Sequence, residues 1–298
     1  MAQHTVVEVG GRRLRLSNLD KVLFPQAGTT KAEVIDYYAR VAPTLVPHLA
    51  ERGVTLRRFP NGVDGGSFFE KRCPSHRPEW MGTVVGPGDR NGNIQYCCLD
   101  SAPALVWAAN MAALEVHAPM ARTDIDTPTM CVFDLDPGDG TSIVECADVA
   151  LDIRHVLDGF DLVGFPKTSG SKGMQVYVPL NTPHTHEQAS AFALAVAQLL
   201  ERAHPDHVVS NMKKSLRGGK VLVDWSQNSR HKTTVAVYSV RARPRPTVST
   251  PVSWDEVRAA AEGEPLTFEI GDVLARIDEH GDLFADTLTV EQSLPDAG

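Results

Sequence analysis

The stretch Cys131-Val-Phe-Asp-Leu-Asp-Pro-Gly-Asp-Gly140 places two carboxylates in an apolar, β-prone run that ends in a turn. Side chains at positions i and i+2 of a β-strand point to the same face, so Asp134 and Asp136 are expected to aim at one point. A carboxylate inside an apolar run is costly unless it is paired or bound to a cation. The alternative is an ordinary strand end that runs into a turn, where Asp, Pro and Gly are common.

A second segment, Lys220-Val-Leu-Val-Asp-Trp-Ser-Gln-Asn228, also has the pattern of a strand and contributes Asp224. If this strand lies beside the first, three carboxylates share one site, where they repel one another and need a cation. Hard oxygen ligands suit Mg²⁺ or Mn²⁺. Pairs of such ions catalyse nucleotidyl transfer in proteins. We therefore predict a divalent-metal site formed by Asp134, Asp136 and Asp224.

Two loops near these carboxylates carry positive charge. Thr168-Ser-Gly-Ser-Lys-Gly173 joins two predicted strands, and its backbone N–H groups and lysine are typical of a phosphate cradle. An ordinary hairpin turn is the alternative. Met212-Lys-Lys-Ser-Leu-Arg-Gly-Gly-Lys220 places four cations just before Asp224. Cations beside carboxylates suit a triphosphate bridged by metal ions, whereas the alternative is a solvated charged loop.

The bulk composition is that of an ordinary globular protein, with 298 residues, 42% of them hydrophobic and 22% charged. The formal net charge of −8 argues only weakly against a nucleic-acid partner, because a local basic patch matters more than the total. No apolar run is long enough to span a membrane. The N-terminus lacks the basic and apolar regions of a signal peptide. We therefore expect a soluble, cytoplasmic protein without a membrane partner.

The cysteines are odd in number and show no repeated spacing, which is not the pattern of a disulfide framework. We therefore expect five reduced thiols, as in a cytosolic protein. Cys73 and His76 could form half of a zinc site, but no second half is evident in the sequence. The five residues are Cys73, Cys97, Cys98, Cys131 and Cys146.

Strands mixed with helices, without regular βαβ alternation, favour an α+β fold. The capping boxes Thr30-Lys-Ala-Glu33 and Ser253-Trp-Asp-Glu256 indicate two helix starts. A polar, glycine-rich loop is expected at 86–93. Helices are expected at 30–49, 102–115, 143–157 and 186–203, with a last one from 253, and strands at 5–17, 54–59, 161–166, 174–180 and 233–240. We expect a single domain over 1–298, with an N-terminal part over 1–120 and a catalytic core over 121–298.

Taken in order, several motifs resemble the polymerase domain of bacterial ligase D, a member of the archaeo-eukaryotic primase superfamily. The resemblance implies a primase-polymerase fold, with mixed β-sheets flanked by helices around a carboxylate metal site. It implies a DNA-dependent nucleotidyltransferase that extends a primer 3′-hydroxyl at gaps or double-strand breaks in non-homologous end joining, with ribonucleotides preferred. The motifs are Asn18-x-x-Lys21, Thr30-Lys31, Arg57-Arg-Phe-Pro-Asn-Gly62, Phe68-Phe-Glu-Lys71, Glu115-Val-His117, Asp134-Leu-Asp-Pro137, Thr168-Ser-Gly-Ser-Lys-Gly173 and Asp224-Trp-Ser-Gln-Asn228.

The resemblance also implies a role for individual residues. Asp134, Asp136 and Asp224 would bind two divalent cations, with Mn²⁺ preferred and Mg²⁺ possible. Phe68 and Phe69 would stack at the template, although a buried core pair is the alternative. The incoming nucleotide or primer would contact Arg57, His117, Ser169, Lys172, Arg217, Gln227, Lys232 and Arg241. A pocket for the 5′-phosphate of a downstream strand would be formed by Asn18, Lys21 and Lys31.

The sequence departs from the family pattern at Gln175, where the phosphate-cradle motif usually ends in histidine. Glutamine keeps a hydrogen-bond donor and acceptor but cannot become positively charged. We expect an active enzyme in which nucleotide affinity, sugar preference or rate is altered. The sequence shows no ligase or nuclease domain, which suggests a stand-alone homologue. We expect it to be associated with the nucleoid. Its expected partners are gapped or broken DNA with a 5′-phosphate, nucleoside triphosphates, a separate DNA ligase and an end-binding protein.

Two functions of other classes remain open at this point. A metal-dependent phosphatase also uses an Asp-x-Asp motif at a strand end, although such enzymes need it on an early strand of an α/β fold. A non-catalytic module that binds DNA ends is the other alternative, and Gln175 is the feature that favours it. The three aspartates argue against such a module, because a site without catalysis has no need of buried carboxylates.

Overall fold

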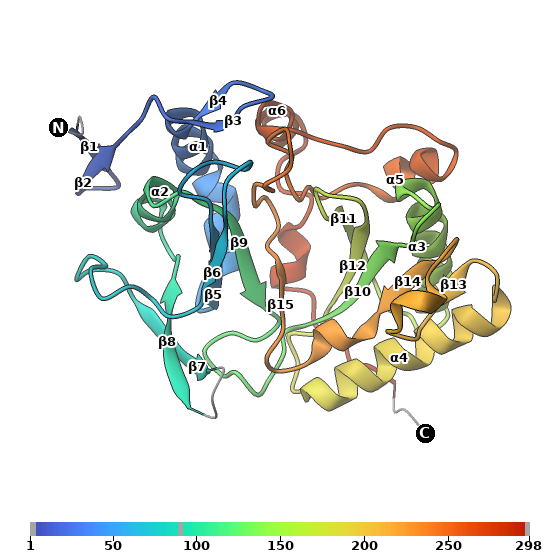
Figure 1. Ribbon diagram of the computed structural model, residues 1–298. Helices are drawn as coiled ribbons and strands as arrows, with labels where there is room; N and C mark the ends of the chain where they lie inside the picture. The colour runs from blue at the N-terminus through green and yellow to red at the C-terminus, as the bar shows by residue number, and fades with distance from the viewer. Residues whose placement is uncertain (1–3, 89–91, 296–298) are drawn as a thin grey trace. The chain divides into compact units, whose positions relative to one another are not determined.

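The computed structural model describes residues 4–88 and 92–295, so 89–91 of the expected glycine-rich loop lie outside the described residues. The chain forms two compact units, each of which is described by itself (Figure 1). Unit 1 comprises Met1–Thr123, Val235–Val248 and Phe268–Gly281. Unit 2 comprises Asp124–Thr234, Ser249–Thr267 and Asp282–Gly298.

Unit 2 contains a five-stranded sheet in the order β11-β12-β10-β14-β13. Neighbouring strands run antiparallel, except that β13 and β14 run parallel. The strands are β10 (Met130–Pro137), β11 (Phe165–Thr168), β12 (Met174–Pro179), β13 (Val208–Val209) and β14 (Val221–Asp224). The helical elements are α3 (Ile143–Asp158), α4 (His186–Ala203), α5 (Trp254–Ala261) and the short η1 (Lys214–Leu216), η2 (Trp225–Asn228) and η3 (Ala285–Leu288).

The helices α3 and α4 cover one face of this sheet. Phe133 of β10 packs edge-on against Phe192 of α4, with ring centroids 6.1 Å apart. The Cys146 thiol of α3 donates a hydrogen bond to the carbonyl oxygen of Leu135, at 3.6 Å. Because successive side chains alternate between faces, Asp134 points to the opposite face, away from the helices. The alternation along β10 therefore separates a helix-covered core from a face that can hold polar groups.

Unit 1 contains a sheet in the order β9-β5-β8-β7, with β6 also paired to β5. Two hairpins precede it, β1-β2 and β3-β4. The strands are β1 (His4–Val9), β2 (Arg12–Ser17), β3 (Val22–Phe24), β4 (Thr29–Thr30), β5 (Gly53–Arg58), β6 (Phe68–Glu70), β7 (Thr83–Pro87), β8 (Asn93–Cys98) and β9 (Ala113–Pro119). A further strand, β15 (Thr233–Val235), includes the point in the sequence at which unit 2 ends and unit 1 resumes. The helices are α1 (Lys31–Leu49), α2 (Ala102–Asn110) and α6 (Ile270–His280).

Helix α1 begins where its capping box predicts. The N–H group of Glu33 donates to the Thr30 hydroxyl at 3.3 Å, and the N–H group of Thr30 donates to the Glu33 carboxylate at 2.7 Å. Pro43 and Pro47 lie inside the helix without ending it. The apolar stripe that predicts the helix is buried, including Val34, Tyr37, Tyr38, Val41 and Leu45.

The α+β fold class is confirmed, and several element boundaries differ from the expectation. The helix expected at 102–115 ends at Asn110, and the chain turns at Ala112, whose φ is 57°. Glu115 and His117 therefore lie in a strand, because a continuous apolar run does not distinguish a buried helix from a buried strand. Helix α6 was not expected at all. The strand expected at 161–166 begins at Phe165, and the one expected at 233–240 ends at Val235.

The expectation of five reduced thiols is wrong for two of them, because Cys73 and Cys97 form a disulfide. The N–H group of Cys73 donates to the carbonyl oxygen of Gln95 at 2.7 Å, which holds its segment beside β8. The two Cα atoms lie 4.7 Å apart, within the bonding range of roughly 4.4–6.8 Å. The proposed zinc half-site at Cys73 is thereby excluded, since its sulfur is in the disulfide. Cys98, Cys131 and Cys146 are free and buried.

Among the described residues, no helix combines the length and the apolar character that crossing a membrane requires.

The disulfide gives a test of stability. It closes a segment with a sequence separation of 24, and a loop of that size stabilises a fold by about 3 kcal/mol by restricting the unfolded chain. We expect Cys97→Ser to lower the free energy of unfolding by about that amount under oxidising conditions. Urea unfolding with and without a reductant measures it. Reductant should leave the Cys97→Ser protein unchanged, whereas a Cys98→Ser control should keep the reductant-dependent loss seen in the native sequence.

Candidate active site

Strand register in unit 2 places four polar side chains in one row across four neighbouring strands. Asp134 of β10 lies directly opposite Asp224 of β14 on one side and Gln175 of β12 on the other. Gln175 in turn lies opposite Lys167 of β11. Directly paired residues share a face of the sheet, so all four side chains point away from α3 and α4.

The three predicted carboxylates meet at this face. Ligand atoms of Asp134, Asp136 and Asp224 all lie within 4.8 Å of one another. Burial and the nearby charge of Asp136 raise the pKa of Asp134 to about 7, although a hydrogen bond from Gln175 opposes the shift. Three oxygen donors that repel one another are the donor set that Mg²⁺ and Mn²⁺ prefer. The residues present therefore fit a divalent metal centre.

Asp224 is the most buried of the three, with 8% of its surface exposed. Its Oδ1 accepts hydrogen bonds from the N–H group of Ser226 at 2.9 Å and from the Ser226 hydroxyl at 2.6 Å. Its Oδ2 accepts a hydrogen bond from Nε2 of Gln227 at 2.9 Å. Gln227, for which the family resemblance implies a contact with nucleotide or primer, thus lies beside the carboxylates and orients one of them.

Two glycines allow the basic loops to approach the end of β10. A Cβ atom on Gly173 would lie 1.9 Å from the carbonyl oxygen of Leu135, and one on Gly138 would lie 1.8 Å from that of Arg217. No other residue fits at these distances. The phosphate-cradle turn and the basic loop over 212–220 therefore both lie against β10, next to the aspartates that it carries.

The cradle turn is held by its own serine. The Ser169 hydroxyl accepts hydrogen bonds from the N–H groups of Ser171 and Gly173, at 3.2 and 3.3 Å. Two of the N–H groups expected to face a phosphate thus have a partner within the turn. Lys172 is exposed, so its ammonium group is the accessible cation of this turn. Arg217 is half-buried, and its Nη2 donates to the carbonyl oxygen of Met212 at 2.6 Å.

Unit 1 gathers three predicted nucleotide-binding residues around a buried carboxylate. The side chain of Glu115 is 1% exposed and lies 2.9 Å from His117 Nε2, 3.3 Å from Arg241 Nε and 3.5 Å from Arg57 Nη1. Burial alone would raise the pKa of Glu115, but the hydrogen bond from His117 and the charge of Arg241 lower it to about 2. Burial lowers the pKa of His117, against the effect of Glu115.

Phe68 and Phe69 are exposed, with 45% and 56% of their surfaces accessible, which excludes the alternative of a buried core pair. The Arg57 guanidinium lies 5.3 Å from the Phe69 ring centroid, and the His117 ring lies 5.6 Å from it. Arg58 lies 5.3 Å from the Phe68 ring. The aromatic pair therefore adjoins the cluster around Glu115 and presents apolar rings flanked by cations.

The residues expected to bind a 5′-phosphate also lie together in unit 1. Asn18 and Lys21 line a cavity of about 560 Å³. Lys21 Nζ donates to Asn61 Oδ1 at 3.2 Å, and Lys31 Nζ donates to the carbonyl oxygen of Ser17 at 2.6 Å. Burial and the charge of Lys21 lower the pKa of Lys31 to about 8. An anion bound at this position would relieve the repulsion between the two lysines.

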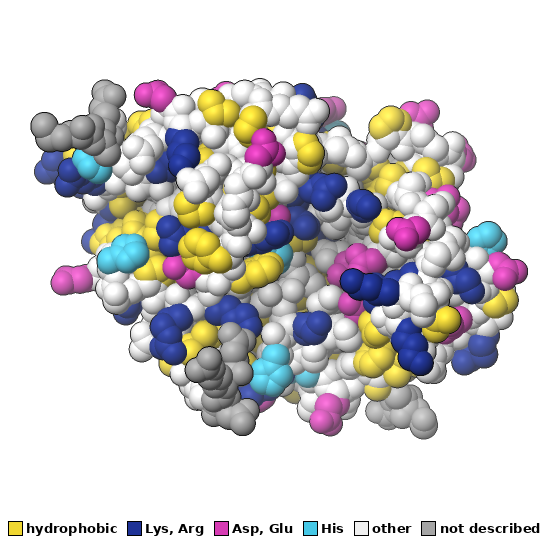
Figure 2. Space-filling model, in the orientation of Figure 1, with side chains coloured by type: hydrophobic (Ala, Val, Ile, Leu, Met, Phe, Trp, Pro, Cys, Tyr) yellow, Lys and Arg dark blue, Asp and Glu magenta, His cyan; other side chains and the backbone are white. Residues whose placement is uncertain are grey.

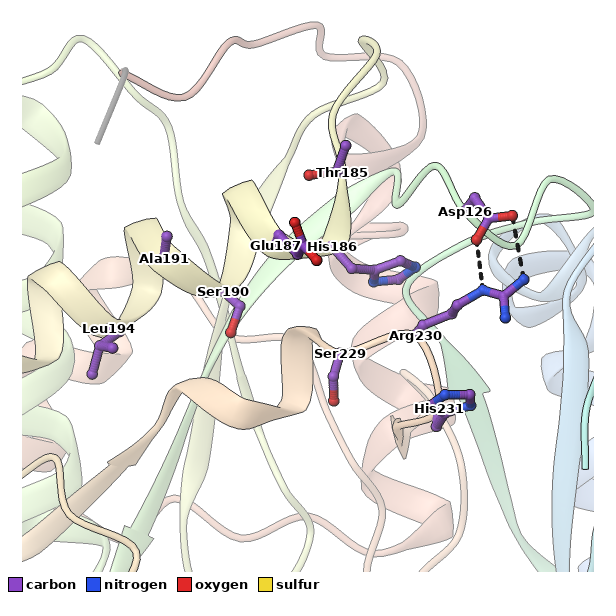
Figure 3. Close-up of a pocket in the computed structure, with 10 residues that line it drawn as sticks. All are labelled: Asp126, Thr185, His186, Glu187, Ser190, Ala191, Leu194, Ser229, Arg230 and His231. Atoms are coloured by element: carbon purple, nitrogen blue, oxygen red, sulfur yellow. Dashed lines mark hydrogen bonds and ion pairs between the residues drawn. The ribbon is translucent and has the colours of Figure 1, made fainter. Parts of the chain in front are cut away.

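A second cavity of about 640 Å³ lies in unit 2, at the start of α4 and the end of η2 (Figure 3). Arg230 points toward Asp126, and its Nε lies 2.6 Å from a carboxylate oxygen. The positive charge of Arg230 is thus matched locally, whereas the next cation in the sequence, Lys232, is exposed. Lys and Arg side chains also appear at many places on the face of the molecule in Figure 2, despite the negative net charge.

Sequence reasoning missed two residues of these clusters. Glu115 appeared only as part of a motif, and its placement in an expected helix concealed that it shares a strand face with His117. The alternation Glu-Val-His is the signal that could have identified it. Lys167 was not considered, because its position next to Gln175 depends on the pairing of β11 with β12.

Known proteins are similar to this chain in sequence and in fold. The family model described as "LigD, primase-polymerase domain" matches residues 30–284. The chain is 44% identical to the multifunctional non-homologous end joining protein LigD of Mycolicibacterium smegmatis, over 100% of the chain and 40% of that protein. It is 30% identical to the bifunctional LigD of Bacillus subtilis, over 95% of the chain and 45% of that protein. The chain thus spans less than half of these relatives.

A solved structure agrees with the sequence comparison. It is the polymerase domain of Mycobacterium tuberculosis ligase D in complex with DNA, with a TM-score of 0.88 and 43% identity over 94% of this chain and 99% of that one. The resemblance inferred from the motifs, the fold class and the enzyme class are confirmed. The chain belongs to the LigD primase-polymerase domain family, a family of nucleotidyltransferases.

Proposed function

We propose that the protein is a DNA-dependent nucleotidyltransferase that extends a primer 3′-hydroxyl at gaps or double-strand breaks during non-homologous end joining. The observation that carries the proposal is the convergence of Asp134, Asp136 and Asp224 on one face of the unit 2 sheet, in a chain of the LigD primase-polymerase family. The DNA in the complex of the M. tuberculosis polymerase domain supports a nucleic-acid substrate.

We propose two divalent cations as cofactors, with Mn²⁺ preferred, held by the three aspartates. When bound, these ions would lower the pKa of the attacking hydroxyl and neutralise charge on the triphosphate. Ser226 and Gln227 would keep Asp224 oriented through the hydrogen bonds described above. Lys172 and Arg217 would bind phosphate oxygens, because both belong to loops that lie against β10.

We also propose roles for the residue clusters of unit 1 and for the other predicted nucleotide-binding residues. In unit 1, we propose that the cations around Glu115 contact nucleotide or primer and that Phe68 and Phe69 stack at the template. We assign Asn18, Lys21 and Lys31 to a downstream 5′-phosphate. Ribonucleotides are the proposed preferred substrates, and a DNA ligase and an end-binding protein are the proposed partners. Nucleotide binding is further assigned to Arg57, His117, Ser169, Gln227, Lys232 and Arg241.

Primer extension tests the central proposal. On a gapped duplex with a downstream 5′-phosphate, Mn²⁺ and ribonucleotides, we expect template-matched extension by the native sequence. Asp134→Ala should reduce the rate by at least about 10³-fold, since it removes one of the three carboxylates that would hold the catalytic ions. The same variant should still bind the gapped duplex. Binding by the native protein without extension would instead favour the non-catalytic end-binding module, and release of phosphate from a small ester without template would favour a phosphatase.

The proposed phosphate pocket predicts a selective defect. Lys21→Ala should abolish the preference for a gap with a 5′-phosphate, because Lys21 lines the cavity shared with Asn18 and carries the positive charge assigned to the phosphate. Fluorescence anisotropy with phosphorylated and unphosphorylated gaps at several salt concentrations measures this. Arg13→Ala, on an exposed position of the neighbouring hairpin, is the control and should keep the preference. Equal weakening of both substrates by Lys21→Ala would refute the assignment.

The raised pKa of Asp134 predicts how pH affects the metal-free protein. Its pKa of about 7 exceeds the ordinary 3.8, so between these values the folded state holds more protons than the unfolded state. The free energy of unfolding therefore falls as pH rises through this window. Asp134→Asn removes the titration, so its stability advantage in a chelator should grow from pH 4 to pH 7.

Thermal unfolding of the two proteins across this pH range measures the effect. Mn²⁺ added at pH 7.5 should raise the melting temperature of the native sequence, because an ion that binds only the folded state stabilises it. The Asp134→Asn protein should respond less. Parallel pH curves for the two proteins would contradict the assigned shift.

A further inference from the structure

Lys167 of β11 is a buried cation, with 1% of its surface exposed. Burying an ammonium group is costly unless its neighbours compensate for the lost water. The contacts of this ammonium group therefore show what compensates for its burial in unit 2. Lys167 lies on the same face of the sheet as the aspartates, because it is paired with Gln175.

The hydrogen bonds around Lys167 have a defined direction. Its Nζ donates to Gln175 Oε1 and to Ser249 Oγ, each at 2.6 Å. The Ser249 hydroxyl donates its own hydrogen to the carbonyl oxygen of Thr168 at 2.9 Å, which leaves its lone pair for Lys167. The ammonium also lies 5.4 Å from the centroid of the Tyr177 ring, a favourable cation–π distance.

These contacts decide the orientation of the Gln175 amide, which is itself 2% exposed. With Oε1 against the ammonium, the Nε2 group faces β10 and donates to Asp134 Oδ1 at 2.9 Å. The reversed amide would place an NH₂ group against the ammonium and an oxygen against the carboxylate. Both contacts would then be repulsive, so the charge of Lys167 favours the donating orientation of the amide, together with the Tyr177 hydroxyl, which donates to the same Oε1 at 3.4 Å.

We propose that Lys167 is a positioning residue of the metal centre that acts through Gln175. Its positive charge fixes the amide whose N–H group orients the Asp134 carboxylate. The inference rests on the proposed function, because it assigns the aspartates to metal ions. It also explains how Gln175 can serve at this position. Glutamine cannot carry a charge itself, but it accepts a hydrogen bond from a side chain that does.

The expected consequence concerns metal affinity. Some side chains orient a metal ligand through a hydrogen bond without contacting the metal. Removing such a side chain typically lowers metal affinity by about 10–100-fold. Lys167 acts one residue further away, so we expect Lys167→Met to weaken Mn²⁺ binding by about 10-fold, the lower end of that range. Methionine keeps the unbranched chain and removes the charge. Calorimetric titration with Mn²⁺ alone, without DNA or nucleotide, measures this independently of catalysis.

Ser249→Ala is the matched control for a purely structural role. It removes one acceptor of the same ammonium group but leaves the path from Lys167 through Gln175 to Asp134 intact. We expect it to lower thermal stability while changing Mn²⁺ affinity by less than about 2-fold. Equal weakening of Mn²⁺ binding by Ser249→Ala and Lys167→Met would overturn the proposal, because loosened packing alone would then explain both.

Gln175→His tests whether the effect passes through the amide. An imidazole N–H can donate to Asp134 without a cation behind it, so its orientation does not depend on Lys167 in the same way. In the Gln175→His protein, we expect the additional Lys167→Met change to cost less than about 2-fold in Mn²⁺ affinity, against about 10-fold with glutamine. A cost that is the same in both backgrounds would refute transmission through Gln175.

Lys167→Gln covers the case in which Lys167→Met does not fold. It keeps an N–H donor for Gln175 Oε1 but removes the charge, and it should also weaken Mn²⁺ binding. Native-like affinity in a folded Lys167→Gln or Lys167→Met protein would overturn this inference and leave the proposed function intact. A native sequence that neither binds Mn²⁺ nor extends a primer would overturn the proposed function itself, and this inference with it.

Discussion

The pairing of Asp134 with Asp224 across β10 and β14 is the constraint on which the site depends. Strand register sets the two carboxylates side by side, and the alternation along β10 adds Asp136 to the same face. Such a cluster is unfavourable by itself, as the raised pKa of Asp134 indicates. The cluster nevertheless lies on a well-formed sheet, with helices packed on the other face. Bound cations would offset the repulsion among its carboxylates.

The surroundings of a buried carboxylate shift its pKa in opposite directions in the two units. In unit 1, His117, Arg57 and Arg241 surround Glu115, and its pKa falls to about 2. In unit 2, the carboxylates face one another, and the pKa of Asp134 rises to about 7. The negative charge of Glu115 is already balanced by neighbouring side chains. Glu115 therefore positions Arg57, His117 and Arg241. The aspartate cluster has excess negative charge and is suited to recruit metal ions.

Close backbone approach is the second requirement of the site. Gly138 and Gly173 each lie where a Cβ atom would collide with a carbonyl oxygen of a neighbouring segment. The basic loop and the cradle turn can therefore lie against the strand that carries Asp134 and Asp136. In the proposed function, cations held close to the metal-binding face would strengthen binding of a polyphosphate, because less ordering of the loops would be needed on binding.

The sequence by itself determined the carboxylate triad, the helix starts at the capping boxes and the family. These features depend on local rules, namely the two-residue period of strands, side-chain capping and short motifs. Tertiary structure alone decided that Arg57 lies against Glu115, that Cys73 bonds Cys97 and that Lys167 contacts Gln175. Each of these depends on which strand pairs with which and in what register, and such long-range pairing is selected by the packing of the whole unit rather than by the residues nearby.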